Sequence, residues 1–355
     1  MNNKHLFLDI HLIQTLPPSN INRDDTGSPK TAQYGGVKRA RVSSQSWKRA
    51  IREYFNEKSG DANIGVRSLN IVKYIVEKIT AMEDNSALDE AMEKANKILN
   101  AGGIKTTDNK VKALFFLGES QAKQLAKAAI AGEKDKKVIT AILKENPAVD
   151  IALFGRMVAD DPNLNEDASC QVAHAISTHA VQTEFDFFTA VDDLAPDDNA
   201  GAGMLGTVEF NSSTLYRYAN VAVHEFEKQL GGNVEEVANA LKLFIESFAN
   251  SLPTGKMNTF ANQTLPQAIV VALRNDRPVN LVSAFENPVK AYDGYVDKSI
   301  EKLFEEFVKV EKFVNPPEAL IYVTLNDSVV LRNAKQAESL HELVDIFGTL
   351  IRERI

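Results

Sequence analysis

The chain has 355 residues, of which 44% are hydrophobic and 25% are charged, and its formal net charge is −8. We therefore expect a soluble globular protein, with two or more domains or with one core that carries large insertions. No apolar run is long enough to cross a membrane, and the single cysteine, Cys170, excludes an intramolecular disulfide and a cysteine metal site. A reducing cytoplasm fits these features.

The N-terminal third begins with a strand and contains one clear helix. Apolar residues alternate through 4–14, where Asp9 and His11 interrupt them, so this segment is a strand and not a signal peptide. Residues 17–36 are polar and rich in turn formers, which indicates a loop. A helix is expected at about 44–57. The segments 69–100 and 110–145 are rich in Ala, Lys, Glu and Leu and indicate several helices.

The rest of the chain alternates between strands and helices. We expect helices at 150–156 and 168–181, then a hairpin made of 208–210, a turn at 211–213 and a strand at 215–224. A helix at 234–250, a strand at 268–274, a helix at 300–314, a strand at 321–325 and a helix at 338–353 follow. Without the helical block, the order is βαββαβ, which is that of a ferredoxin-like or RRM-type sheet. The predicted fold class is therefore α+β.

One window, 27–52, is strongly basic in this acidic chain. It holds seven basic residues and no acidic one, namely Lys30, Lys38, Arg39, Arg41, Lys48, Arg49 and Arg52. A local positive surface on an acidic protein favours a polyanion as partner, and nucleic acid is the first candidate. The alternative is an ordinary solvated basic surface.

The helix inside this window is amphipathic. Ser43 and the serines after it are typical N-caps, and Trp47, Ile51, Tyr54 and Phe55 fall on one face at helical spacing. The other face carries Gln45, Lys48, Arg49 and Arg52. Lys48 and Arg52 are four residues apart, so they are neighbours that would repel each other unless an anion lies between them. A helix N-terminus beside an unpaired pair of cations suits a phosphate.

Several motifs resemble those of the CasC family, the backbone subunit of Cascade, which is the type I-E CRISPR surveillance complex. Three lie early in the chain: NRDD at 22–25, YGG at 34–36 and RARVSSQSWKRAIR at 39–52. The others are VDIALFGRM at 149–157, HAISTH at 174–179, FFTAVDDL at 187–194, YRYAN at 216–220 and AFENPVKAYDG at 284–294. They follow in order and cover most of the chain.

This resemblance implies a hand-like fold with a modified RRM or ferredoxin-like palm. The palm is expected at 1–58 and 211–355, an inserted helical fingers domain at 59–182, and a β-hairpin thumb at 183–210. It also implies that several copies stack along one CRISPR guide RNA beside the other Cascade subunits, which are the large, small, guide-5′-end and guide-processing subunits. The guide then pairs with the target DNA strand.

The resemblance also assigns residues to the RNA. Ser43, Gln45, Lys48 and Arg52 match the family motif that grips the guide backbone, and Lys38 and Arg49 belong to the same basic window. Arg23 is expected to join them, or else to pair with Asp24 or Asp25. Of Arg39 and Arg41, one is expected to face RNA and the other to be structural. Lys256, in a loop between a helix and a strand, is a further phosphate candidate.

An apolar wedge that displaces a base is expected at Phe187 and Phe188. We expect Phe187 to pack into the core and Phe188 to be the wedge, while the residues at 199–203 form the tip of the thumb. Met157 resembles a second apolar prop under a base.

No metal, cofactor or catalytic residue is expected. His174 and His179 are five residues apart, which does not fit a helical metal pair, and packing or hydrogen bonding is favoured for both. The adjacent acids at 160–161, 192–193 and 197–198 point to opposite faces if they lie on strands, so solvated loop acids are favoured. Two alternatives remain: an aspartate-dependent ribonuclease related to this family, and a monomeric RRM-type RNA-binding regulator.

Overall fold

A computed structural model describes residues 5–58, 60, 63–83, 87–158, 161–190 and 204–355. At its centre, β1 (Phe7–Ser19) lies between two antiparallel neighbours, β11 (Met204–Ala222) and β12 (Pro266–Arg274). Beyond β12 come β13 (Ala319–Thr324) and β14 (Lys335–Gln336). Beyond β11 come β8 (Cys170–Val172), β9 (Ala175–Ser177), β3 (Val37–Val42) and β2 (Thr31–Tyr34). The fold is α+β with a mostly antiparallel central sheet, as expected from the sequence.

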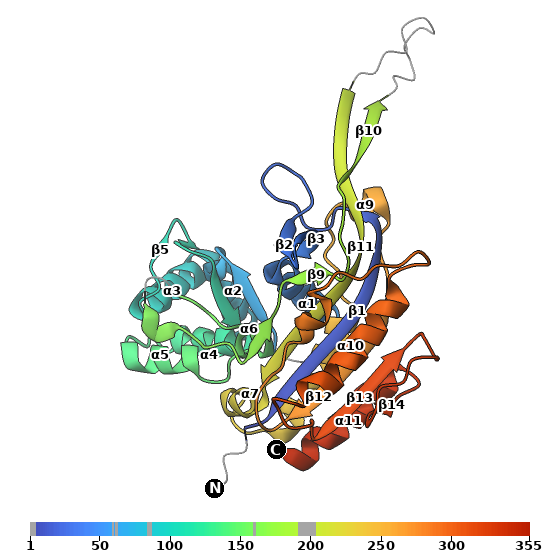
Figure 1. Cartoon of the computed structure of the whole chain (residues 1–355). Coiled ribbons are helices and arrows are strands. Elements are labelled where there is room, and N and C mark those ends of the chain that lie inside the picture. The colour runs from blue at the N-terminus through green and yellow to red at the C-terminus, as the bar shows by residue number, and fades with distance from the viewer. Residues whose placement is uncertain (1–4, 59, 61–62, 84–86, 159–160, 191–203) are drawn as a thin grey trace, which may run out of the picture.

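Helices cover both faces of this sheet, so β1 is buried on both sides. Leu8, Ile10 and Leu12 contribute to one core, with side chains from α1 (Ser44–Lys58), α7 (Val223–Gln229), α8 (Val234–Asn250) and α11 (Leu340–Arg354). The opposite face packs against α10 (Val296–Val310) and the short helix η3 (Leu281–Phe285). The helix α10 covers that face (Figure 1), on which Asp9 and His11 of β1 are buried.

The expected loop at 17–36 contains the end of β1 and the strand β2, and two further predictions of secondary structure are wrong. The expected turn at 211–213 does not occur, because β11 continues through it: Ser213 pairs with Leu16, and Asn211 pairs with Ser19 after a bulge in β1. The expected helix at 168–181 is replaced by the strands β8 and β9, which pair with β11. In both places the hydrogen-bond partners are supplied by distant strands, and these partners override weak local preferences.

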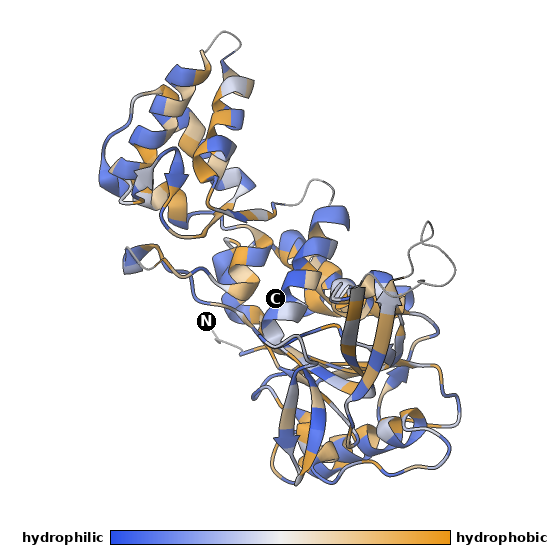
Figure 2. Ribbon diagram, turned by 90° about the horizontal axis from the view of Figure 1, so that it is seen from above, coloured by the Kyte–Doolittle hydropathy of each residue, from blue (hydrophilic) through white to orange (hydrophobic). Residues whose placement is uncertain are grey.

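Part of the chain forms a helical module with a core of its own (Figure 2). It contains α2 (Ile71–Met82), α3 (Leu88–Ala101), α4 (Glu119–Ile130) and α5 (Lys136–Lys144). Two small sheets join them, formed by β4 (Gly65–Ser68) with β7 (Phe115–Gly118) and by β5 (Thr106–Thr107) with β6 (Lys110–Val111). Two short helices, α6 (Val149–Phe154) and η1 (Pro162–Leu164), follow α5 in the chain. The domain boundaries at 59 and 182 remain predictions.

A two-stranded hairpin projects from the sheet (Figure 1). It is formed by β10 (Glu184–Ala190) and the first part of β11, and every residue of β10 is exposed. The expected thumb tip at 199–203 lies outside the described residues. The short helix α9 (Met257–Phe260) lies near the base of this hairpin, where Phe260 contacts Phe210. Of the helices within the described ranges, none is both long and apolar enough to cross a membrane.

Candidate nucleic-acid interface

The basic helix α1 forms as its amphipathic pattern predicts. Trp47, Ile51 and Phe55 are buried against the sheet. Ser43 precedes the helix and is itself buried; its carbonyl accepts the N–H of Trp47, and its own N–H donates to Asn22 Oδ1 at 2.9 Å. Ser43 therefore fixes the start of α1, and its hydroxyl faces the N–H of the third helical residue rather than the solvent.

A first cleft, which we call the loop cleft, lies on one side of α1 and has a volume of about 690 Å³. Three separate segments meet there: the loop at 21–27, the helix α1, and the loop at 253–256. They bring together Arg23, Arg49 and Lys256. A side chain at Gly255 would place its Cβ 2.4 Å from the carbonyl oxygen of Ile21, so only glycine allows the two loops to approach this closely.

Arg23 forms no ion pair with the acids that follow it, in the part of the chain that the structure describes. Asp24 instead accepts hydrogen bonds from the N–H and hydroxyl of Thr26 and from the N–H of Ser28. The bond from the Thr26 hydroxyl contributes most to the lowered pKa of Asp24. The carboxylate therefore stabilises its own loop.

A second cleft, the module cleft, lies between α1 and the helical module and has a volume of about 1010 Å³. From α1 it is lined by Gln45, Lys48, Arg49 and Arg52. The module contributes Arg67, Phe116 and Met157, and the Met157 side chain is 84% exposed. Because Arg49 lines both clefts, they meet along the exposed face of α1.

The pair of unpaired cations predicted on α1 is not found, because Arg52 is engaged. Its Nε donates to Asp150 Oδ2 at 2.9 Å, and its guanidinium lies 4.3 Å from the centre of the Phe116 ring. Asp150 lies far from α1 in sequence, so no local pattern could show this pairing. Lys48 lies 5.5 Å above the Phe154 ring, and Arg49 pairs with Glu53 at 2.8 Å on the surface.

Of the two arginines of β3, Arg39 is the structural one. It is fully buried and donates to the carbonyl oxygens of Tyr34, Ser177 and Phe285. Burial lowers its pKa. Its assignment to RNA is therefore wrong in this conformation, because no donor reaches the surface. Arg41 is half-buried and contacts Thr31 and His174, while Lys38 is exposed.

Phe187 and Phe188 lie on opposite faces of the hairpin. Phe187 pairs with Thr207 and Phe188 with Gly206, and successive strand residues alternate. Phe187 is 65% exposed, so the prediction that it packs into the core is wrong. Phe188 is 37% exposed, and a Cβ on Gly206 would lie 2.3 Å from its ring. Phe188 therefore packs across the hairpin, while Phe187 projects from it.

Sequence reasoning missed two exposed apolar residues of this hairpin. Phe185 is 66% and Leu205 64% exposed, and the strand register places both on the face of Phe187. The spacing of two residues between Phe185 and Phe187 was the available signal.

The sequence also gave no indication of the structural role of Arg217. It is buried between Trp47 and Phe248, with its guanidinium 3.6 Å from the centre of the Trp47 ring. It donates to Gln14 and to the carbonyl oxygen of Phe248, and burial lowers its pKa to about 9. It therefore joins α1, the sheet and α8.

His179 and Cys170 take structural positions, as expected, whereas His174 is exposed and contacts Arg41. His179 stacks on Tyr295 at 3.8 Å, and its Nε2 accepts the N–H of Thr214. Cys170 is buried in the core, which raises the pKa of its thiol to about 12. Within the described ranges, no group of three or more His, Cys, Asp or Glu side chains could hold a metal ion. The acids at 160, 192–193 and 197–198 lie outside these ranges, and Asp161 pairs with Lys136 at 3.0 Å.

Comparisons with known proteins agree on one family. The model of a family described as CT1975-like protein matches residues 8–346. A solved structure, "CRISPR RNA-guided surveillance complex, pre-nicking", contains a chain that is 34% identical, with a TM-score of 0.85, over 97% of this chain and 100% of that one. A chain of a second "CRISPR RNA-guided surveillance complex" is 29% identical, with a TM-score of 0.75, over 97% and 99%. No curated protein matches.

Proposed function

The chain belongs to the CT1975-like family of CasC-type CRISPR proteins, and from this membership we propose that it is a guide-RNA-binding backbone subunit of a type I-E surveillance complex. In this proposal it acts in the cytoplasm, and its central sheet is the modified RRM-type palm. Several copies assemble along one guide RNA beside the other Cascade subunits, and the guide pairs with the target DNA strand. The protein holds the RNA backbone, and base pairing supplies the sequence specificity.

The observation that carries this proposal is the meeting of three segments along α1, each of which brings one basic side chain to the loop cleft. Arg23, Arg49 and Lys256 are far apart in the sequence, yet they line one cleft. Three acids line the same cleft: Asp24 is occupied by its own loop, Asp25 is exposed, and Glu53 is held only in an exposed pair with Arg49. An exposed pair contributes about 1 kcal/mol or less, so a phosphate can replace Glu53.

We further propose that the chain is not an enzyme. Asp150 forms an ion pair with Arg52, and Asp161 forms one with Lys136. A carboxylate in such a pair is poorly placed to bind magnesium for phosphoryl transfer. RNA held by this chain should therefore stay intact when magnesium is added.

The test is to purify the tagged chain from its native host, sequence the bound RNA and measure the mass of the complex. Repeat-flanked guides, with protein mass in multiples of one subunit, support the proposal. Cleavage of the bound RNA on addition of magnesium would favour a ribonuclease. One protein copy on each RNA would favour a monomeric regulator.

A charge-reversal variant tests the surface itself. Arg49→Glu with Lys256→Glu should abolish retention of the guide while the chain stays folded, because neither residue is buried. The matched control is Lys312→Glu, an exposed lysine beyond the end of α10 that lines neither cleft. Loss of RNA in the control, or full retention in the double variant, would contradict the assignment.

A further inference from the structure

Two neighbouring residues of the module differ sharply in exposure. Arg156 is 3% exposed, whereas Met157 is 84% exposed and stands in the module cleft. Met157 shares this cleft with Lys48, Arg49 and Arg52 of α1, so a polyanion bound to these cations would lie beside the methionine side chain.

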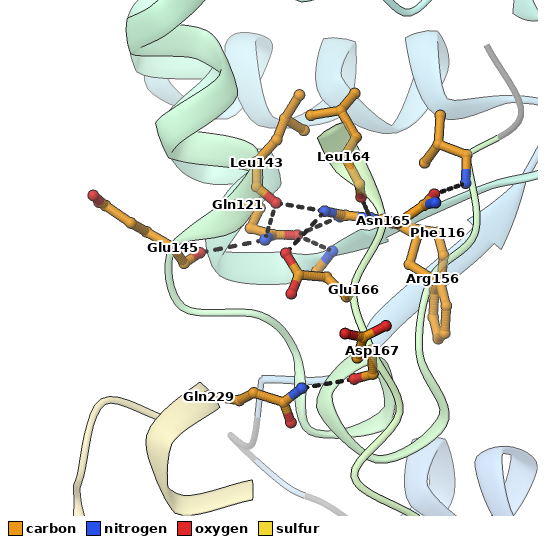
Figure 3. A network of polar contacts seen from close by, with 12 residues as sticks. Phe116, Gln121, Leu143, Glu145, Arg156, Leu164, Asn165, Glu166, Asp167 and Gln229 are labelled. Atoms are coloured by element: carbon orange, nitrogen blue, oxygen red, sulfur yellow. Dashed lines mark hydrogen bonds and ion pairs between the residues drawn. The ribbon is translucent and has the colours of Figure 1, made fainter. Parts of the chain in front are cut away.

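The Arg156 guanidinium donates to groups from four elements of the module (Figure 3). The acceptors are the carbonyl oxygens of Leu143 at 2.7 Å, Leu164 at 3.0 Å and Phe116 at 3.3 Å, and Gln121 Oε1 at 3.4 Å. Glu166 lies 3.7 Å away and supplies the opposite charge. Each bond to a charged donor is strong, so together they fix the side chain in one position.

The backbone around Met157 is fixed as well. Gly155 has a φ of 78°, which favours glycine, and the N–H and carbonyl of Arg156 both bond to Glu166, at 3.0 and 2.8 Å. On the other side, the N–H of Val158 donates to Asn165 Oδ1 at 2.6 Å. Met157 therefore has anchored residues on both sides.

Resting on the proposed function, we propose that Arg156 is a positioning residue for the RNA: it holds the backbone of Met157 so that the methionine side chain meets a nucleotide base. Methionine is flexible and adapts to many apolar surfaces. A fixed backbone removes part of the entropy that would otherwise be lost on binding. The arrangement thus combines an adaptable side chain with a rigid support.

Arginine suits this role better than lysine. Its planar guanidinium carries five N–H donors in a fixed geometry, whereas lysine carries three donors on a single atom. Burial lowers the pKa of Arg156 to about 10, so it remains charged at neutral pH. Arg156→Lys therefore keeps the charge but cannot reach all the acceptors at once.

A double-mutant cycle on the full chain tests the inference, with a fluorescein-labelled single-stranded RNA of mixed sequence as probe. Met157→Ala should weaken binding roughly tenfold, because the apolar contact between the methionine side chain and a base is lost. Arg156→Gln should weaken it similarly, and the double variant should be no weaker than either single one. Additive effects of the two substitutions would overturn the positioning role, because uncoupled residues contribute independently.

Arg274→Gln is the control for general damage to the fold. Arg274 is equally buried, in the central sheet, where it pairs with Asp9 at 3.3 Å. Its effect should add to that of Met157→Ala. If Arg156→Gln does not fold, Asn165→Ala takes its place in the cycle, because it releases the other side of the same backbone.

The outcomes separate this inference from the proposed function. No binding of the probe by the unchanged chain would contradict the proposed function. Binding that Met157→Ala leaves unchanged would overturn the inference and leave the function standing. A Met157 effect that persists undiminished in the Arg156→Gln background would also overturn it.

Discussion

Arg52 of α1 and Asp150 of α6 form an ion pair across 98 positions of the chain, with 2.9 Å between Nε and Oδ2. The Asp150 carboxylate is completely buried, and its Oδ1 accepts the N–H of Gly65 at 2.8 Å. Burial raises the pKa of Asp150, while the hydrogen bond and the charge of Arg52 lower it. The pair joins the basic helix to the helical module at the module cleft.

Removing Arg52 should therefore destabilise the protein. Arg52→Gln leaves a buried carboxylate without its cation, and we expect a loss of about 3 kcal/mol in the free energy of unfolding. Adding Asp150→Asn should restore part of that loss, because the buried charge is removed with its partner. Urea denaturation measures both. The control is Arg49→Gln, whose exposed pair with Glu53 should contribute less than about 1 kcal/mol. Equal losses in Arg52→Gln and Arg49→Gln would refute the role of the pair.

Substitution by glutamine should reduce the stability of the protein at Arg39 but not at its neighbour Lys38. Arg39→Gln should cost at least about 2 kcal/mol of stability, because buried carbonyl oxygens lose a charged donor. Lys38→Gln should leave stability unchanged, because its side chain is exposed. If Lys38 contacts a phosphate, its loss should reduce the log–log salt slope of RNA binding by about 0.7. Thermal denaturation and a salt titration test the two effects. A stable Arg39→Gln chain with weakened RNA binding would reverse the assignment.

On the hairpin, Phe187 is now the better wedge, because it projects while Phe188 packs on Gly206. Phe187→Ala should leave the fold intact and weaken the contact with a displaced base by about 1–3 kcal/mol if the ring stacks. Chemical probing of the assembled guide should show a regular period of reactive bases that fades in this variant.

Gly206→Ala tests Phe188 in the same way, because the added Cβ must displace the Phe188 ring. This substitution should change the packing of Phe188 but not the position of Phe187. A period that survives Phe187→Ala but is lost in Phe188→Ala would return the wedge to Phe188, as the sequence first suggested.

The buried groups Asp9 and His11 should change stability with pH in opposite directions. Burial lowers the pKa of His11 from 6.5 to about 3 and raises that of Asp9 from 3.8 to about 6. His11 therefore contributes stability that is present above pH 6.5 and is lost as the pH falls towards 3. Asp9 contributes stability that is present below pH 3.8 and is lost as the pH rises through about 6.

Between pH 6 and pH 4 the two contributions oppose each other, so single substitutions should separate them. Relative to the unchanged chain, Asp9→Asn should lose stability more steeply on acidification, and His11→Gln less steeply. Each difference should be at most about 1.4 kcal/mol per pH unit. The free energy of unfolding of all three chains is measured across this pH range. If it changes with pH equally in all three, neither group titrates there.

Local patterns in the sequence were enough to predict the elements whose periodicity is strong. The helix at 234–250 has the bounds of α8, and the apolar face of α1 is buried as its spacing indicates. The α+β class and the family also followed from the chain, because the motifs lie in order along it. These features depend on residues within a few positions of each other, so sequence reasoning reaches them.

Only the tertiary structure decided which basic residues are held by distant segments of the chain. Arg39, Arg52 and Arg156 look alike in the sequence to Lys38 and Arg49, yet carbonyl oxygens and a carboxylate from distant segments engage the first three. The same holds for the strands β8 and β9, whose partners lie on β11. Hydrogen bonds and ion pairs act over a few ångströms in space whatever the separation along the chain, so the acceptor of each donor becomes known only when the fold brings the two together.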